Sequence, residues 1–446
     1  MSRILKFNSR ALGSADALRR AAAIVREEAP AGAVIMVSAL QGCTEGLREA
    51  LVLASRGDLA GGRDRLDGLA DQHRSIAREL GLIDAVHPAW ESLFLRLDTL
   101  MEGTALVGEL TPRTRDAGRA VVDSLAAELF TKLLEDDARA EFRDLREVVR
   151  TDGRHGRACP DPPGILEAAA PWTDALRGGA HIITQASLGQ GPDGATTTLG
   201  RGGSDLIATL LGEALGVSEV QIWTDVDGIL SADPSLVPEA RPIPLLSLAE
   251  AAALSSFGAE TLRADALAPA ARAGIRLVVG NTNHPSAGRT AILPEAPKRS
   301  RGEVTSVAYK EGVVAARFPP DHRLEDLLET ALRLEEAGCF RYGLLSNPEG
   351  ALLVFRPETS AAAQLEALER SGVILERGWA VVALVGEGLR QDPGAPARLL
   401  APLANERLGA VLGASPVSVA FLAPEERLPD LIPALHRCFI LEGVDA

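Results

Sequence analysis

Residues 196–234 constrain the fold and function of this chain more than any other stretch, because they place two kinds of site within one strand–helix–strand unit. The first is a turn of small residues that contains Gly200, Gly202 and Gly203 and leads into a predicted helix. Glycine lets a backbone approach a ligand closely, and the first N–H groups of a helix bind anions. Arg201 adds a planar guanidinium suited to a carboxylate or a phosphate.

The second site follows an apolar strand predicted over 220–223. Three polar residues come directly after that strand, namely Thr224, Asp225 and Asp227. In a parallel α/β sheet, ligands bind beyond the carboxyl ends of the strands. The sequence therefore predicts that this edge of the sheet borders a bound ligand.

Two blocks of sequence are highly specific. Thr-Leu-Gly-Arg-Gly-Gly-Ser-Asp over 198–205, followed by Trp-Thr-Asp-Val-Asp-Gly-Ile over 223–229, resembles the aspartate kinases of the amino acid kinase family. Further on, Val-Ala-Leu-Val-Gly-Glu-Gly-Leu over 382–389 is similar to an ACT regulatory domain. Aspartate kinases commonly carry two such domains at the C-terminus, so the resemblance covers nearly the entire chain.

Alternating apolar strands and helices predict a mostly parallel sheet covered by helices. The N-terminal strands are expected over 4–7, 33–39, 181–185, 220–223 and 275–280, with a helix over 14–28 capped by Ser14. Beyond a proline- and charge-rich stretch, a weak β-α-β-β-α repeat appears. Its elements are expected over 304–308, 313–317, 324–336, 351–355 and 361–371, then over 380–385, 395–403, 417–422 and 428–438.

The resemblance implies an α/β amino acid kinase fold, with a mostly parallel sheet sandwiched by helices, followed by two ferredoxin-like ACT domains. We expect a catalytic-type domain over 1–293, a linker over 294–302, and ACT domains over 303–375 and 376–446. ACT domains pair to bury their sheet edges, so a homodimer is expected. They also imply an amino-acid effector, which the sequence does not identify.

Composition excludes several classes of function. The net charge of −15 argues against nucleic acid as a partner, since phosphate binding needs a basic face. The four cysteines lack metal-ligand spacing and indicate reduced thiols in a cytoplasmic protein. No stretch is long and apolar enough to span a membrane, and the N-terminus lacks a signal peptide. No cluster of metal ligands stands out, so no protein-bound metal is predicted.

The reaction that the resemblance implies is transfer of the ATP γ-phosphoryl group, with Mg²⁺, to the side-chain carboxylate of L-aspartate or a related amino acid. Both reactants are anions, so cations and oriented N–H groups must neutralise the charge that develops. Lys6, one of only four lysines, is expected at the phosphates. Asp205 is expected to organise the catalytic centre.

The remaining expected contacts fall into two sets. The acceptor amino acid is expected to contact Ser38, Thr44, Asp123, Arg201 and Ser204, with Arg201 on its α-carboxylate. The nucleotide is expected to contact Lys6, Gly202, Gly203, Thr224, Asp225 and Asp227.

Several phosphate-side positions depart from the family. Asn8 and Ser9 replace glycines, Glu260 replaces a lysine, and Ser235 replaces an arginine. Losing one preorganised charge contact costs about 3–4 kcal/mol in the transition state.

Two readings of these departures stay open. In one, Arg10 and Arg263 supply the missing cation; in the other, Arg10 pairs with Glu260 and closes the nucleotide pocket.

Three functions are therefore considered. The first is a working aspartate kinase that feeds amino-acid biosynthesis and is regulated through ACT domains. The second is a catalytically impaired homologue that binds an amino acid as a regulatory protein, because the retained motifs lie on the amino-acid side. The third is a kinase for a different amino-acid carboxylate, with Asp123, Ala186 and Ser187 reshaping the pocket.

Overall fold

The structure, a computed structural model, describes residues 2–29, 32–135, 139–200, 202–258, 262–320, 322–347, 350–358, 361–403 and 408–442. The chain forms two compact units. Unit 1 comprises residues 1–229 and 262–294, and unit 2 comprises residues 230–261 and 295–446. The segment 230–261, which the sequence analysis assigned to the catalytic-type domain, therefore packs with the C-terminal unit.

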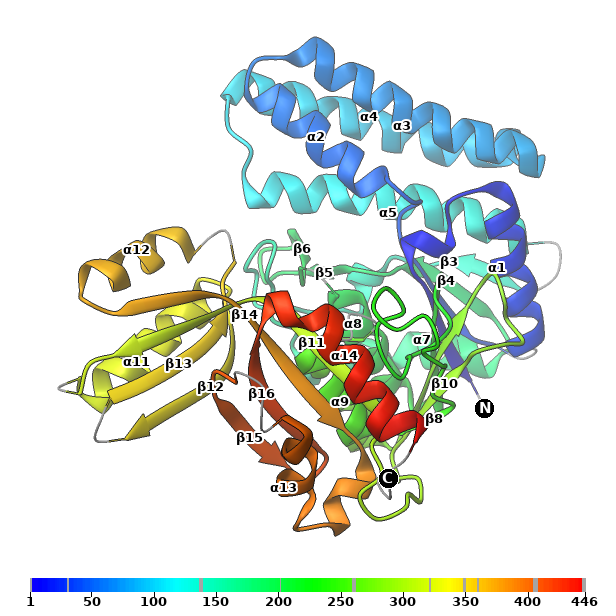
Figure 1. The fold of residues 1–446 in the computed structure, drawn as a ribbon. Helices are drawn as coiled ribbons and strands as arrows, with labels where there is room; N and C mark the ends of the chain where they lie inside the picture. The colour runs from blue at the N-terminus through cyan, green and yellow to red at the C-terminus, as the bar shows by residue number, and fades with distance from the viewer. Residues whose placement is uncertain are drawn as a thin grey trace. The chain divides into compact units, whose positions relative to one another are not determined.

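Unit 1 is built on a sheet whose strands are parallel except at one edge, where β10 runs antiparallel to β9 (Figure 1). The strands that this unit contributes are, in order across the sheet, β3 (Ala140–Phe142), β4 (His181–Gln185), β2 (Val34–Val37), β1 (Arg3–Phe7), β7 (Glu219–Thr224), β9 (Arg276–Asn281) and β10 (Thr290–Leu293). The central strands β1, β2, β4 and β7 are buried along their whole length from Ile4 onward. The prediction of a mostly parallel sheet is confirmed.

Helices surround the sheet of unit 1, and α5 packs directly on β2, β3 and β4. The helices are α1 (Ala15–Glu28), α2 (Cys43–Ser55), α3 (Leu59–Leu80), α4 (Ile83–Val107), α5 (Pro112–Leu134), α6 (Pro162–Ala168), α7 (Ala170–Arg177), α8 (Gly203–Leu215) and α10 (Leu267–Ala273). Helices α2 to α5 pack side by side as a layer of long helices (Figure 1). A short hairpin, β5 (Leu188–Gln190) and β6 (Thr196–Thr198), precedes α8.

Local signals account for where several elements begin. Helix α1 starts after Ser14, whose hydroxyl accepts a hydrogen bond from the Ala17 N–H at 3.2 Å, as its sequence predicted. In unit 2, helix α9 (Leu248–Phe257) starts with a reciprocal cap between Ser247 and Glu250.

Unit 2 contains an antiparallel sheet in the order β12 (Phe340–Asn347), β13 (Gly350–Arg356), β11 (Ser306–Phe318), β14 (Ile374–Val385), β16 (Ser418–Pro424) and β15 (Val411–Ser415). Its helices are α9, α11 (Leu324–Glu336), α12 (Ala362–Arg370), α13 (Ala395–Leu400) and α14 (Leu428–His436), and a short strand, β8 (Leu245–Ser247), precedes α9. This sheet with helices resembles paired ACT domains, in line with the predicted fold class.

The two lobes of unit 2 are not consecutive along the chain. One apolar core draws on residues between 314 and 373, whereas the other combines Val304 and Val307 with residues between 380 and 439. Strands β11 and β14 run through both lobes. The predicted division into 303–375 and 376–446 therefore differs from the packing, because the first strand of the former range belongs to the core of the latter.

Glu250 explains why 230–261 packs with unit 2. Its buried carboxylate accepts hydrogen bonds from the Thr305 hydroxyl at 2.7 Å and the Glu387 N–H at 3.0 Å. Gly258, at the end of α9, lies so close to β11 that a Cβ would stand 2.0 Å from the Tyr309 carbonyl oxygen. The stretch expected as a linker is also anchored, since the Gly302 N–H donates to the Gly388 carbonyl at 2.8 Å.

His73 makes the helical layer sensitive to pH. Its ring is fully buried and lies edge-on to Trp90 and Phe94, with centroids 5.7 and 6.3 Å away. Burial lowers the pKa of His73 to about 4, from a model-compound value of 6.5. Between those two values the unfolded chain binds the proton more readily, so stability is full above pH 6.5 and falls as the pH drops toward 4.

We predict that His73→Gln reduces this acid destabilisation. At pH 4.5 the wild-type penalty from this residue is about 2–3 kcal/mol, at about 1.4 kcal/mol per pH unit. Thermal unfolding followed by circular dichroism at pH 7 and pH 4.5 checks it. His87→Gln, on the exposed face of α4, is the control. An equal pH dependence in wild type and His73→Gln would contradict the assignment.

Candidate active site

Lys6 lies at the centre of the unit 1 sheet, near the carboxyl end of β1. Its side chain is buried, and its Nζ lies 2.5 Å from Oδ1 of Asp205 at the start of α8. A second hydrogen bond goes to the side-chain oxygen of Asn8. Because an ammonium group carries three donors, one N–H of Lys6 remains for another acceptor.

The glycine-rich turn forms the start of α8. Gly200 and Gly202 have φ angles of +77° and +71°, a left-handed conformation that favours glycine. A Cβ on Gly202 would stand 2.3 Å from Cδ of Arg263, so the stem of that arginine covers the turn. The Arg263 guanidinium pairs with Asp265. Arg201 lies outside the described residues.

A third set of hydrogen bonds forms at the loop that follows β2. The Ser38 N–H donates to the Phe7 carbonyl at 3.2 Å, which holds the start of this loop beside β1. The next N–H, of Ala39, donates to Oδ1 of Asp123 at 3.1 Å. The other carboxylate oxygen of Asp123 accepts from the Ser187 hydroxyl at 2.6 Å. The fold thus brings Asp123 of α5 next to the Ser38 loop, and the role of both residues at the acceptor stays a prediction.

Thr44 and Ser204 lie near the first residues of α2 and α8, and both side chains are partly exposed. Cys43, next to Thr44, is not a nucleophile, because burial raises the pKa of its thiol to about 12.

Asp116 is a residue that the sequence analysis missed. It is 3 % exposed, and it accepts hydrogen bonds from the Thr198 hydroxyl at 2.6 Å and the Gly156 N–H at 2.9 Å. His155 Nδ1 lies 3.1 Å from the same carboxylate. Asp116 thereby ties helix α5 and the loop around Gly156 to the strand that leads into the glycine-rich turn.

Three of the predicted nucleotide residues, Thr224, Asp225 and Asp227, lie at the end of β7 or just after it. The Thr224 hydroxyl donates to Asp225 at 3.1 Å, and Asp227 accepts from the Asn281 side-chain amide at 2.7 Å. Thr282 donates through its N–H to the Thr224 carbonyl at 2.8 Å. Asn281 is the last residue of β9, the next strand in the sheet, and Thr282 follows it, so the end of a second strand contacts the residues at the end of β7. Neither residue was predicted as part of the site.

The phosphate-side departures are placed as follows. Ser9 begins a short 3₁₀ turn after β1, and Arg10 within it is exposed. Ser235 belongs to unit 2, where it donates to Asp233. Glu260 lies outside the described residues, so the expected pair between Arg10 and Glu260 does too.

Among the residues that the structure describes, no group of three or more His, Cys, Asp or Glu side chains has the arrangement of a metal site. Among the same residues, no helix has both the length and the apolar character needed to cross a membrane.

Known proteins match this chain in sequence and in structure. The sequence pattern of the amino acid kinase family matches residues 1–281. Lysine-sensitive aspartokinase 3 of Escherichia coli is 32% identical over 458 residues, which cover 97% of this chain and 98% of that protein. Aspartokinase 1 of Arabidopsis thaliana, a chloroplastic protein, is 28% identical over 99% of this chain and 80% of its own length.

A solved structure agrees. The crystal structure of E. coli aspartokinase III in complex with aspartate and ADP superposes with a TM-score of 0.84 at 30% identity, covering 98% of this chain and 99% of that one. The chain therefore belongs to the amino acid kinase family. Within that family it is one of the aspartokinases, since the match to them runs through both units.

Proposed function

We propose that this chain transfers the γ-phosphoryl group of ATP to the side-chain carboxylate of L-aspartate. A carboxylate oxygen attacks the γ-phosphorus, the bond from that phosphorus to the bridging oxygen breaks, and ADP leaves. The products are ADP and 4-phospho-L-aspartate. The E. coli structure similar to this chain is a complex with aspartate and ADP, which supports this choice of substrates.

The observation that carries the proposal is the buried Lys6–Asp205 pair at the carboxyl edge of the sheet. A buried lysine is costly unless it is paired, so its position between two acceptors is maintained by the fold. The remaining N–H of Lys6 can donate to a phosphate oxygen. The positive charge of the ammonium group offsets the negative charge that spreads over the transferred phosphoryl group.

The acceptor is proposed to lie between the Ser38 loop and the glycine-rich turn. Arg201 binds its α-carboxylate, and Ser38, Thr44, Asp123 and Ser204 surround the rest. Asp123 is held by two hydrogen bonds and lies 3.7 Å from Arg119, so the position of its carboxylate beside the proposed acceptor is fixed.

The nucleotide is proposed to bind along Gly202, Gly203, Thr224, Asp225 and Asp227. Mg²⁺ binds oxygen ligands and usually keeps most of its contacts with phosphates and water. The carboxylates of Asp225 and Asp227 are of the right chemistry to hold it. When bound, it neutralises phosphate charge.

The first test is the activity of Lys6 variants in a hydroxamate assay, which traps aspartyl phosphate. We expect Lys6→Ala to lower kcat by about 10²–10³-fold, because a preorganised charge is lost. Lys6→Arg keeps the charge and the pair with Asp205, so it should retain more activity. Lys132→Ala removes a lysine that pairs with Glu135 on the surface and serves as the control.

Calorimetry with Mg·ATP and with aspartate tests the two alternatives, which are an impaired homologue that binds an amino acid and a kinase for a different amino-acid carboxylate. Aspartate binding without ATP binding would identify an impaired homologue that acts as an amino-acid sensor. Turnover of another amino-acid carboxylate in preference to aspartate would identify the third function. Circular dichroism of Lys6→Ala separates loss of chemistry from loss of folding.

Arg263 is proposed as the replacement cation on the phosphate side. Its stem already covers Gly202, and its guanidinium would exchange Asp265 for a phosphate oxygen. We expect Arg263→Ala to raise the KM for ATP at least tenfold, with the KM for aspartate little changed. Arg272→Ala, which breaks an exposed pair with Glu213, is the control. Equal KM values in both variants would reject this role.

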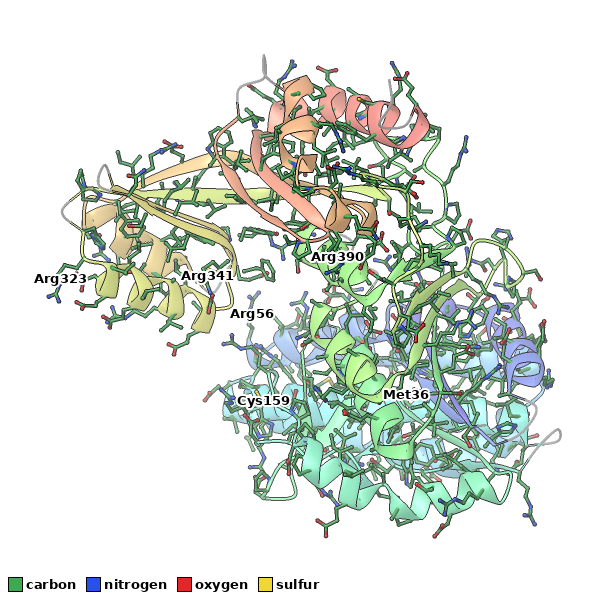
Figure 2. The ribbon with its side chains drawn as sticks, turned by 90° about the horizontal axis from the view of Figure 1, so that it is seen from below. Met36, Arg56, Cys159, Arg323, Arg341 and Arg390 are labelled. Carbon is green, nitrogen blue, oxygen red and sulfur yellow. The ribbon has the colours of Figure 1, made fainter. Side chains whose placement is uncertain are left out.

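We also propose that unit 2 binds an amino-acid effector and joins two copies of the chain. One face of α11 is packed in the core through Leu327, whereas Leu324, Leu328 and Leu332 remain 58 %, 45 % and 59 % exposed. Their spacing of four places them on one helix face. Arg323 and Arg341 lie near the two ends of α11 (Figure 2).

Leu328→Asp should therefore disrupt a homodimer. We expect the wild type to elute at about twice the chain mass of 46.8 kDa in size-exclusion chromatography with light scattering, and the variant at that mass. Burying a charge in an apolar interface is the physical reason. Leu95→Asp, on the exposed face of α4, should stay dimeric. A dimeric Leu328→Asp would place the interface elsewhere.

A further inference from the structure

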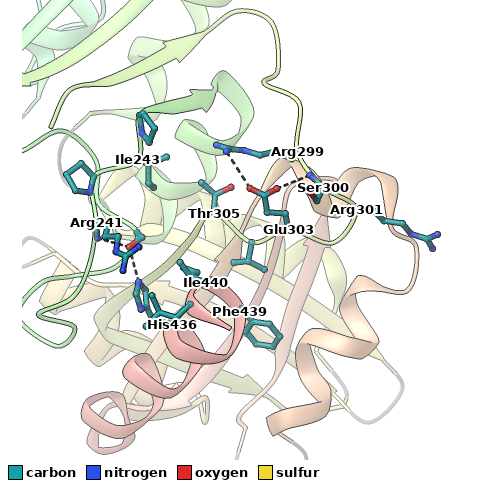
Figure 3. A pocket seen from close by; sticks show the side chains of 15 residues that line it. Arg241, Ile243, Arg299, Ser300, Arg301, Glu303, Thr305, His436, Phe439 and Ile440 are labelled. Carbon is teal, nitrogen blue, oxygen red and sulfur yellow. Dashed lines mark hydrogen bonds and ion pairs between the residues drawn. The ribbon is translucent and has the colours of Figure 1, made fainter. Parts of the chain in front are cut away.

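A pocket of about 500 Å³ lies within unit 2, and none of its lining residues is a predicted active-site residue (Figure 3). Its volume falls in the range of small-molecule sites. Residues from three stretches of the chain line it: 231–244, 299–305 and the end of α14 with the turn after it. Ile243, Val304 and Phe439 give it a buried apolar wall.

The polar lining is rich in arginine although the chain as a whole is acidic. Arg241, Arg299 and Arg301 line the pocket, and Glu303 is the one carboxylate among its lining residues. The Glu303 carboxylate is held by the Ser300 N–H at 2.8 Å and by Arg299 at 3.5 Å. Arg299 also lies 3.9 Å from the buried carboxylate of Glu250.

The three arginines differ in whether their guanidinium groups already bind a partner within the protein. Arg299 donates to the Leu245 carbonyl at 2.6 Å, and Arg301 shares Asp392 with Arg398. Arg241 is exposed, and no carboxylate in the described parts of the chain lies within ion-pair distance of its guanidinium. Its charge is therefore free for a ligand.

His436 adds a buried polar atom to the same lining. Its side chain is 0 % exposed, and Nε2 lies 2.9 Å from the Ser231 hydroxyl. The same hydroxyl accepts from the Arg241 N–H at 3.0 Å. Nδ1 of His436 has no hydrogen-bond partner within the described structure, whichever tautomer the ring adopts. A buried polar atom left unpartnered is costly, and a bound ligand would satisfy it.

We propose that this pocket is a second ligand site, which takes a small carboxylate with an apolar body. The carboxylate binds Arg241, the apolar body lies against Ile243, Val304 and Phe439, and a ligand oxygen reaches His436. Guanidinium groups bind carboxylates through two parallel hydrogen bonds, which fixes the orientation of the ligand. The site is independent of phosphoryl transfer and does not rest on the proposed function.

Titration calorimetry of the full chain with phenylacetate tests the site, with phenylacetamide as the neutral analogue. Excess L-aspartate is present throughout, so that the acceptor site does not take up the probe. We expect saturable binding of phenylacetate and at least tenfold weaker binding of phenylacetamide. Arg241→Ala should weaken phenylacetate binding at least tenfold.

Arg437→Ala is the matched control, because Arg437 follows His436 and is exposed but does not line the pocket. It should bind phenylacetate as the wild type does. Ile243→Trp, which fills the pocket, should abolish binding while the melting temperature is retained. No saturable binding to the wild type, equal binding by Arg241→Ala, or equal affinity for the amide would each overturn the proposal. Binding of inorganic phosphate in place of phenylacetate would overturn the ligand class.

Discussion

The buried ion pair between Lys6 and Asp205 is the interaction on which the rest of unit 1 depends. Removing two charges from water costs several kcal/mol each, so such a pair persists only where its geometry is good and other hydrogen bonds complete it. Here Asn8 supplies that further bond. The pair connects the central strand β1 to the first turn of α8, across 199 residues of sequence. The position of the glycine-rich turn relative to the sheet is therefore set by electrostatics at the proposed phosphate site.

Two buried carboxylates of unit 1 have a different role, because each one joins separate segments of the chain through hydrogen bonds. Asp123 and Asp116 lie two turns apart on the buried side of α5, and each accepts hydrogen bonds from two separate segments of the chain. One holds the loop after β2, and the other holds the approach to the glycine-rich turn. A carboxylate can accept several bonds at once, whereas a neutral side chain of this size accepts fewer. Helix α5 thus sets the distance between the two halves of the candidate acceptor site, and a shift of this helix would move both together.

Much of this arrangement could be predicted from sequence because its signals are local. Apolar runs marked β1, β2, β4, β7 and β9, and Ser14 marked the start of α1. Lys6 lies near the carboxyl end of β1, and Asp205 lies at the start of α8, the helix that leads into β7, the parallel neighbour of β1. Both residues are therefore expected at the same edge of the sheet. Asp116 could not be found this way, since its partner Thr198 is 82 residues away and no motif contains it.

Strands β12 and β15 were missed because most of their side chains are exposed and lack an apolar alternation. The stretches 304–308 and 313–317 were expected as separate strands, but they form one strand, β11, with a break in register next to Gly312.

The shared strands of unit 2 have a consequence for how such a chain can change over evolution. The lobe between 314 and 373 leaves β11 and returns on β14, and its first and last strand segments are paired neighbours, as Ala316 opposite Leu375 shows. An insertion whose two ends lie side by side can be lengthened, exchanged or lost without displacing the strands on either side of it. The lobe between 314 and 373 can therefore be exchanged as a unit. The strands, helices and apolar core that hold the outer lobe together would remain as they are.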